Sequence, residues 1–291
     1  MSARLFCFGL GYTARALGSA LRRQGFQVAG TCRDPESASR LREEGFEVAL
    51  FDTGRPLGDA TAALSGVTHL LSSVPPDAAG DPVLRTHGRD IAELAGALRW
   101  AGYLSTTGVY GDRQGGWVDE GSEVSPSGER GLRRAAAEAD WLDLWWDGGL
   151  PVHVFRLAGI YGPGRSAIDQ VRAGRARRIV KPDQVFSRIH VDDIVATLIA
   201  SMERPRPGAV YNVCDDEAAP PQDVVAYACE LLHAPPPPLV PFEDAGLSEM
   251  GRSFFDDNKR VRNDRIKDEL GVRLRYPDYR SGLRAILEAE G

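Results

Sequence analysis

The stretch Leu5-Phe6-Cys7-Phe8-Gly9-Leu10-Gly11-Tyr12-Thr13-Ala14 decides the fold class of this 291-residue chain. Its first four residues form a short apolar run rich in aromatic side chains, which is typical of a buried strand. The glycines follow at the spacing Gly-x-Gly-x-x-Ala. Ala14, Leu17 and Leu21 then recur at i, i+3 and i+7, the stripe of a helix that faces one side. The segment therefore predicts a strand, a tight glycine loop and a helix in direct succession.

The glycine loop predicts a dinucleotide site. Gly9 permits the tight turn after the strand, and Gly11 lets a pyrophosphate approach the backbone. Ala14 is small enough for close packing of the helix on the sheet. The start of this helix, at Tyr12 and Thr13, supplies N–H groups and a positive dipole end to an anion. The alternative is a structural glycine turn, because the motif is specific only in its strand–loop–helix context.

Similar short apolar runs recur along the chain, separated by longer helix-like stretches. These runs are residues 27–31, 47–51, 69–73, 103–105, 152–155 and 210–213. Strands that alternate with helices imply right-handed crossovers and a parallel sheet covered by helices on both faces. The predicted fold class is therefore α/β, a doubly wound parallel Rossmann sheet with a smaller discontinuous C-terminal lobe.

The regular alternation breaks after about residue 160, which predicts a second lobe. We expect three parts in the chain. They are an NAD(P)-binding Rossmann domain at residues 1–162 plus 189–215, a substrate-binding lobe at 163–188 plus 216–275, and a C-terminal helix at 276–291. The proline run at 235–238 is short and lies in a globular pattern, so we interpret it as a rigid loop rather than a partner-binding segment.

Composition and charge exclude several classes of function. The chain has 35 Lys and Arg against 41 Asp and Glu, a net charge of −6, and no long basic block. These values argue against a nucleic-acid partner. No run of 18 apolar residues occurs, so we expect no membrane partner. The four cysteines include no Cys-x-x-Cys pair, which predicts reduced buried thiols and no metal site.

The remaining expectations about location and partners follow from these exclusions. The N-terminal segment turns glycine-rich before a signal-peptide apolar region is complete, so we expect a cytoplasmic protein. The expected partner is a small-molecule substrate, which can be anionic, and a homodimer is compatible with the sequence.

The end of the second strand bears on the choice between NADP and NAD. A free ribose 2′-OH, as in NAD, favours a carboxylate about 20 residues past the loop. Asp34 has this distance, but it precedes Pro35 and matches a helix N-cap followed by proline at the first helical position. Arg33 is the first long side chain after the strand and is placed to meet a 2′-phosphate. We therefore favour NADP over NAD.

Two further residues at strand ends are assigned to the cofactor site. Asp52 follows the third strand, where it either contacts the adenine or is a plain turn residue. Ser73 ends the fourth strand.

Several ordered segments show a family resemblance over nearly the whole chain. Besides the glycine loop, they are Leu104-Ser105-Thr106-Thr107-Gly108-Val109-Tyr110-Gly111, Phe155-Arg156-Leu157-Ala158-Gly159-Ile160-Tyr161-Gly162-Pro163-Gly164, Arg188-Ile189-His190-Val191-Asp192-Asp193-Ile194 and Val210-Tyr211-Asn212-Val213. In this order and spacing the chain resembles the extended short-chain dehydrogenase/reductase superfamily, in its NAD(P)-dependent epimerase/dehydratase-like branch and that branch's atypical members.

The resemblance implies a catalytic hydroxyl and reveals a departure. Thr106 matches the Ser/Thr that hydrogen-bonds the reacting oxygen, although a strand-end threonine can also satisfy a local backbone group. The family's Tyr-x-x-x-Lys pair falls on Arg130 and Arg134 if Glu138 is aligned with the family's glutamate. Arginine stays protonated and cannot relay a proton. We expect Arg134 to take the lysine's electrostatic role toward the cofactor ribose and Arg130 to face the substrate. The alternative is an exposed helix face on which Glu129 and Glu138 neutralise the two arginines.

Other candidates have weaker support. Tyr110 is a second hydroxyl for catalysis, and Tyr161 and Arg188 are candidates for substrate binding, although the tyrosines in such motifs more often pack as structure. His190 is more simply a structural histidine. Thr107 and Gly108 replace the acidic pair that follows the threonine in sugar-nucleotide dehydratases. A further group of cations either binds a substrate anion or forms a solvated face; its members are Arg165, Arg172, Arg175, Arg177, Arg178, Lys181 and Arg188.

Two functions compete on this evidence. The first is an NADP-binding atypical short-chain dehydrogenase/reductase that transfers hydride as an oxidoreductase or epimerase on a sugar-like or hydroxylated substrate. The second is a catalytically silent NADP-binding sensor or scaffold. The missing Tyr-x-x-x-Lys pair favours the second, and Thr106 favours the first.

Overall fold

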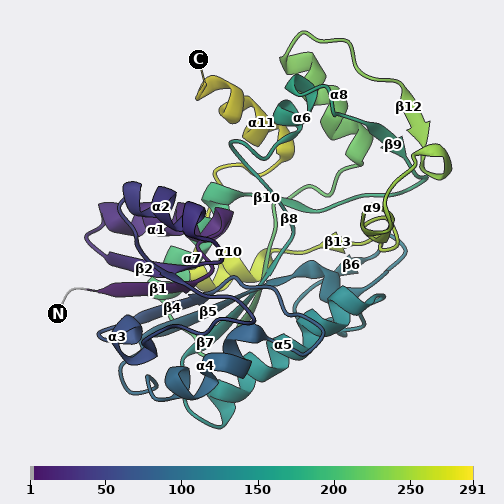
Figure 1. Cartoon of the computed structure of the whole chain (residues 1–291). Helices are drawn as coiled ribbons and strands as arrows, with labels where there is room; N and C mark the ends of the chain where they lie inside the picture. The colour runs from purple at the N-terminus through teal and green to yellow at the C-terminus, as the bar shows by residue number, and fades with distance from the viewer. Residues whose placement is uncertain (1–2, 291) are drawn as a thin grey trace. The chain divides into compact units, whose positions relative to one another are not determined.

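The computed structural model describes residues 3–290, which form two compact units (Figure 1). The sheet unit comprises the residues up to Thr106, Leu132–Arg156 and Val195–Tyr211. The second unit comprises Thr107–Gly131, Leu157–Ile194 and the residues from Asn212 onward. The domain boundaries expected from the sequence stay a prediction.

A seven-stranded sheet forms the core of the sheet unit. In spatial order its strands are β11 (Val210–Val213), β7 (Val152–Leu157), β5 (Trp100–Thr106), β4 (His69–Ser72), β1 (Arg4–Phe8), β2 (Gln27–Cys32) and β3 (Glu47–Leu50). The pairings of β1 with β2 and β4, of β2 with β3, and of β4 with β5 are parallel. The predicted doubly wound parallel fold is confirmed. The strand order reverses at β1, which is where open parallel sheets bind ligands.

Helices cover both faces of this sheet (Figure 1). Helices α1 (Tyr12–Arg23) and α2 (Pro35–Glu43) lie on one face, and α3 (Ala60–Leu64), α4 (Pro82–Ala92) and α5 (Glu129–Trp146) lie on the other. Phe6 and Phe8 of β1, Tyr103 of β5 and Trp141 of α5 share one buried cluster. The alternate residues of β1 therefore point to the α3–α5 face, as the two-residue period of a strand requires.

Local capping explains where several helices begin. The Asp34 carboxylate accepts a hydrogen bond from the Ser37 N–H at 2.8 Å, and Pro35 occupies the first helical position of α2. This confirms the N-cap interpretation of Asp34. Asp81 caps α4 in the same way, through the N–H groups of Val83 and Leu84.

Short strand pairs and helices make up the second unit. The parallel pairs are β8 (Gly159–Tyr161) with β10 (Arg188–His190), β9 (Arg178–Val180) with β12 (Leu239–Pro241), and β6 (Trp117–Val118) with β13 (Arg260–Val261). The helices are α6 (Ala167–Arg172), α8 (Pro221–Leu231), α9 (Glu249–Ser253), α10 (Asp264–Leu270) and α11 (Tyr279–Glu288), with 3₁₀ turns at Thr107–Tyr110 and Phe242–Asp244. Helix α7 (Val191–Glu203) runs from this unit into the sheet unit.

Some expectations about element boundaries need correction. Strand β5 begins at Trp100, not at Tyr103, because Trp100 and Ala101 are also fully buried in the sheet. The pair Asp192 and Asp193 lies in the first turn of α7, as expected for a helix N-terminus. Within residues 3–290, no helix is long and apolar enough to cross a membrane.

Candidate cofactor and active site

The glycine loop makes a tight turn directly after β1. Gly9 has a φ of +85°, a left-handed conformation that favours glycine. A Cβ atom at Gly9 would lie 2.8 Å from the Ser73 hydroxyl oxygen. The Gly9 N–H donates to Thr31 Oγ1 at 2.9 Å, and the Ser73 hydroxyl donates to the Gly9 carbonyl at 2.6 Å. Side chains from β2 and from the end of β4 thus fix the turn, and Ser73 acts through the loop backbone.

The start of α1 fits a pyrophosphate. Gly11 is its N-cap residue, no side chain caps the helix, and the first turn contains no acidic residue. A Cβ atom at Gly11 would have no atom within 4 Å, so the space beside this residue is open. Thr13 and Ala14 are buried against the sheet, and Tyr12 is partly exposed. An anion placed here would meet backbone N–H groups and the positive end of a twelve-residue helix.

A cationic group stands at the end of β2. Arg33 is exposed, and its carbonyl accepts a hydrogen bond from the Arg55 guanidinium. Arg55 also pairs with Asp52 at 3.0 Å, while Asp52 accepts the Gly54 N–H at 2.9 Å. Asp52 thus holds the turn at residues 52–55, and its contact with the adenine stays a prediction. Sequence reasoning missed Arg55, because its approach to Arg33 depends on the pairing of β2 with β3.

Cys32 directly precedes Arg33, so the reactivity of its thiol can be used to follow ligand binding at the end of β2. It is partly exposed, whereas Cys7, Cys214 and Cys229 are buried. Partial burial, followed by the Asp34 carboxylate, raises the pKa of the Cys32 thiol. Only the thiolate is a good nucleophile.

We therefore expect one cysteine of the native protein to react with a chromogenic disulfide reagent, more slowly at pH 8 than free cysteine. The rate should rise with pH through the raised thiol pKa, because the thiolate fraction rises. Saturating NADPH should slow the reaction, and Cys32→Ser should abolish it. Rapid reaction of several thiols in the folded protein, or a rate that NADPH leaves unchanged, would contradict this assignment.

The end of β5 carries Thr106 and is held by α5. Thr106 is the last residue of the strand and is partly exposed. Arg134 of α5 donates from Nη1 to the Leu104 carbonyl at 2.8 Å and to the Tyr103 hydroxyl at 3.2 Å. Its guanidinium carbon also lies 5.6 Å from the centroid of the Tyr103 ring. The structure thus places Arg134 against the strand that carries Thr106, where it positions the strand end.

A buried ion pair supports the same strand from a second side. Glu138 of α5 and Arg156 of β7 have side chains that are 5% and 7% exposed, and Arg156 Nη2 lies 2.8 Å from Glu138 Oε2. Arg156 Nε donates to both carboxylate oxygens, at 3.2 Å and 3.1 Å. The Ser105 hydroxyl donates to the same carboxylate. The pair therefore joins α5, β7 and the residue before Thr106.

The other predicted site residues lie in the second unit and are engaged there. Tyr110 is fully buried, and its hydroxyl donates to Asn212 Oδ1 at 2.7 Å. Tyr161 is also buried and packs edge-on against the His190 ring. His190 accepts the Asp192 N–H at 3.1 Å through Nδ1, and burial lowers its pKa. These contacts place all three side chains in the interior of the second unit. The catalytic role of Tyr110 and the substrate-binding role of Tyr161 stay predictions.

Most of the predicted cations in this unit hold the fold together. Arg188 donates from Nη1 to the carbonyls of Phe186 and Ala219, at 2.7 Å and 3.0 Å, and burial lowers the pKa of its guanidinium. The others with direct partners are Arg172 with Glu290, Arg177 with the Ala245 carbonyl, Arg178 with the Pro237 carbonyl, and Lys181 with the Phe255 carbonyl. The carbonyl contacts occupy some of the donors of these groups, and the substrate-binding role of Arg188 stays a prediction.

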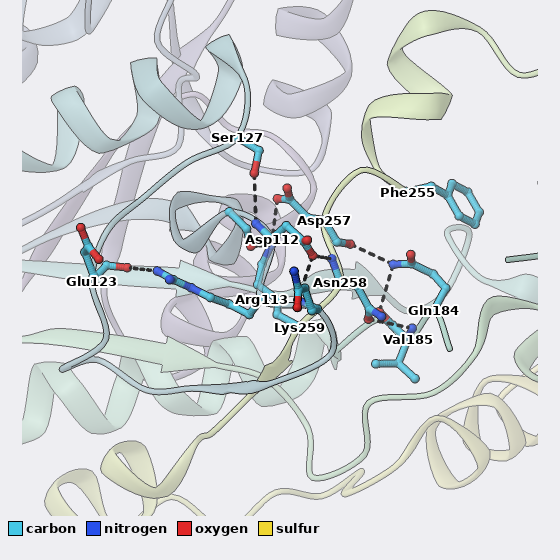
Figure 2. A network of polar contacts seen from close by, with 12 residues as sticks. Asp112, Arg113, Glu123, Ser127, Gln184, Val185, Phe255, Asp257, Asn258 and Lys259 are labelled. Atoms are coloured by element: carbon cyan, nitrogen blue, oxygen red, sulfur yellow. Dashed lines mark hydrogen bonds and ion pairs between the residues drawn. The ribbon is translucent and has the colours of Figure 1, made fainter. Parts of the chain in front are cut away.

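Figure 2 shows a polar network that no sequence motif signals. Lys259 donates to the Gly111 carbonyl at 2.8 Å and pairs with Asp257 at 2.9 Å, and burial lowers the pKa of its amine. The Asn258 N–H donates to Asp112 Oδ1 at 2.8 Å. The segment around Lys259 is thus bound to the loop that follows Tyr110.

No group of three or more potential metal ligands occurs among the residues described.

Fold and loop together define a dinucleotide-binding Rossmann protein of the short-chain dehydrogenase/reductase type. The chain belongs to the NAD dependent epimerase/dehydratase family, whose sequence model matches residues 9–214.

Relatives share nearly the full length of this chain. A "3-diazoavenalumate denitrifying reductase" from Streptomyces sp is 30% identical over 303 residues, which cover 94% of this chain and 96% of the relative. Protein YeeZ from Escherichia coli K12 is 28% identical over 281 residues, covering 93% and 95% of the two chains.

Solved structures give the same fold. The structure of a functionally unknown conserved protein from Silicibacter pomeroyi is 55% identical, with a TM-score of 0.91 and 100% of each chain covered. A UDP-glucuronic acid 4-epimerase from Bacillus cereus, solved in complex with UDP-glucuronic acid and NAD, is 16% identical with a TM-score of 0.76 over 99% and 100% of the chains. At that identity the second likeness concerns the fold alone.

Proposed function

We propose that this protein is an NADP-dependent oxidoreductase that transfers hydride to or from a small hydroxylated or sugar-like substrate. One observation carries the cofactor assignment: α1 begins at Gly11 with open space, no side-chain cap and no acidic residue in its first turn. The exposed Arg33 at the end of β2 supports NADP over NAD. A relative that is named a reductase and aligns over 94% of this chain supports redox chemistry over epimerisation.

In this proposal the chain's own residues bind and orient. The cofactor, when bound, supplies the hydride chemistry. The start of α1 binds the pyrophosphate, and Arg33 binds the 2′-phosphate through a charge-assisted contact. Thr106 donates a hydrogen bond to the reacting oxygen. Arg134 and the pair of Glu138 with Arg156 hold β5 so that this hydroxyl keeps its direction.

A catalytically silent NADP sensor is the second candidate. The observation in its favour is that Arg134, at the position of the family's lysine, contacts the Leu104 carbonyl and the Tyr103 ring. Neither this residue nor Arg130 can relay a proton. Incubation of the NADPH-bound protein with a panel of carbonyl and hydroxylated compounds separates the candidates, because a sensor consumes no NADPH.

The choice of cofactor is tested at Arg33. We expect NADPH to bind more tightly than NADH, and Arg33→Ala to weaken NADPH binding about tenfold to one-hundredfold, since a charge-assisted contact to phosphate contributes about 1.5–3 kcal/mol. NADH binding should not change. Calorimetric titration with both cofactors measures this difference. Arg40→Ala is the matched control, because Arg40 is an exposed arginine on α2. Equal affinities of the parent for the two cofactors would refute the assignment.

A further inference from the structure

Arg130 and Phe254 form an exposed pair in cation–π contact in the second unit. The Arg130 guanidinium carbon lies 5.3 Å from the centroid of the Phe254 ring. Phe254 is 56% exposed and its neighbour Met250 is 62% exposed. Large apolar side chains that gather on a surface mark binding sites more often than single exposed ones do.

The Arg130 guanidinium differs from several other cations of this unit, which have hydrogen-bond or ion-pair partners. Arg252 makes the same kind of ring contact, with Phe242, but that ring is only partly exposed. Arg188 and Lys181 donate to backbone carbonyls, and Arg172 pairs with Glu290. Within residues 3–290, the Arg130 guanidinium has no hydrogen-bond or ion-pair partner, and it makes a cation–π contact with Phe254. A cation–π contact does not use the N–H donors of the guanidinium in hydrogen bonds to oxygen, so these donors can bind the oxygen atoms of a ligand.

The chain that follows Phe254 is firmly held. Phe255 is buried in a cluster with Ile179 and Ala245. Beyond it, Asn258 and Lys259 are bound to the 111–115 loop, and the Gln184 side chain donates to the Asp257 carbonyl at 2.8 Å (Figure 2). The exposed ring of Phe254 is therefore attached to a fixed segment, and its exposure does not result from a loose loop.

We propose that this pair, Arg130 and Phe254, binds a planar aryl carboxylate. A carboxylate matches the fork of one guanidinium bidentately, and a flat ring next to it stacks on the exposed surface of Phe254. The proposal rests on the proposed function. It specifies the substrate of that function as a compound that contains an aryl carboxylate.

Binding of 2-naphthoate, followed by its fluorescence and by ligand-observed NMR, tests the proposal. We expect Arg130→Ala to weaken binding about tenfold or more, because it removes a charge-assisted hydrogen bond. Phe254→Ala should weaken binding about threefold to tenfold through lost stacking. Arg130→Lys should recover only part of the loss, since lysine keeps the charge but lacks the planar fork. Methyl 2-naphthoate and cyclohexanecarboxylate, which lack the charge and the flat ring respectively, should both bind more weakly than 2-naphthoate.

Controls separate this proposal from the cofactor assignment. Arg252→Ala removes a similar contact, in which the guanidinium carbon lies 5.5 Å from the Phe242 centroid, and should leave naphthoate binding unchanged. NADPH affinity is measured on the same samples and should be unchanged in every variant. If the parent protein binds NADPH but not 2-naphthoate, the aryl carboxylate proposal is overturned, whereas the proposed NADP-dependent function is not affected. If inorganic phosphate binds more tightly than 2-naphthoate, and Arg130→Ala abolishes phosphate binding, the proposal is overturned and the pair is a phosphate site.

Discussion

Replacing Glu138 by alanine is expected to lower the free energy of unfolding by about 3–5 kcal/mol, because it leaves the Arg156 guanidinium buried without its counter-charge. Arg156 has a side chain that is only 7% exposed, and its guanidinium donates to both carboxylate oxygens of Glu138. Ser105 would lose its acceptor as well. Urea denaturation followed by circular dichroism measures the loss.

A double-mutant cycle identifies the cause. The double variant Glu138→Ala, Arg156→Ala should be much less destabilised than the sum of the two single variants, since it removes both buried charges. Glu44→Ala is the matched control: Glu44 pairs with Arg15 at 2.6 Å, but these side chains are 40% and 48% exposed. That substitution should cost about 1 kcal/mol or less. Additive effects at Glu138 and Arg156 would show that the pair is not energetically coupled.

The sequence was sufficient to predict the fold because its signals there are local. The apolar run of β1, the glycine spacing and the helical stripe of Ala14, Leu17 and Leu21 lie in one continuous segment. Each requires only a two-residue or a 3.6-residue period to be recognised. The N-cap at Asp34 was predictable for the same reason.

The short strands of the second unit could not be predicted in this way. Pairs such as β6 with β13 contain two residues in each strand and join segments more than a hundred residues apart. So short a strand shows no alternation, and its pairing is determined by tertiary contacts.

Partners of the charged side chains were also hidden from the sequence. The residue type of Arg134 showed that it could not relay a proton, but its contacts with the Leu104 carbonyl and the Tyr103 ring depend on how α5 packs on β5. Arg55 and Lys259 belong to no motif, and they reach Arg33 and Gly111 only through the fold. A sequence thus shows which side chains are charged. It does not show whether such a side chain binds a ligand or a backbone carbonyl.

Gly11→Asp is expected to abolish most cofactor binding without loss of stability. The backbone at Gly11 has φ −81° and ψ −169°, an extended conformation that any residue adopts, and an added Cβ atom meets nothing within 4 Å. Aspartate is also a good N-cap, so α1 should be unchanged or slightly more stable, by up to about 1 kcal/mol. The new carboxylate, however, would lie where the pyrophosphate is proposed to bind. Two like charges about 4 Å apart near a protein surface repel by several kcal/mol, so NADPH affinity should fall by about one-hundredfold or more.

Gly11→Asn separates charge from size at this position. Asparagine has nearly the same shape and also caps helices well, but it adds no charge. Because repulsion is the larger effect, the asparagine variant should retain more NADPH affinity than the aspartate variant, and the difference should shrink as salt screens the charges. Calorimetric titration and thermal unfolding of both variants give affinity and stability on the same protein. If the aspartate variant is as stable as the parent and still binds NADPH equally well, the pyrophosphate does not lie at the start of α1, and the observation that carries the proposed function fails.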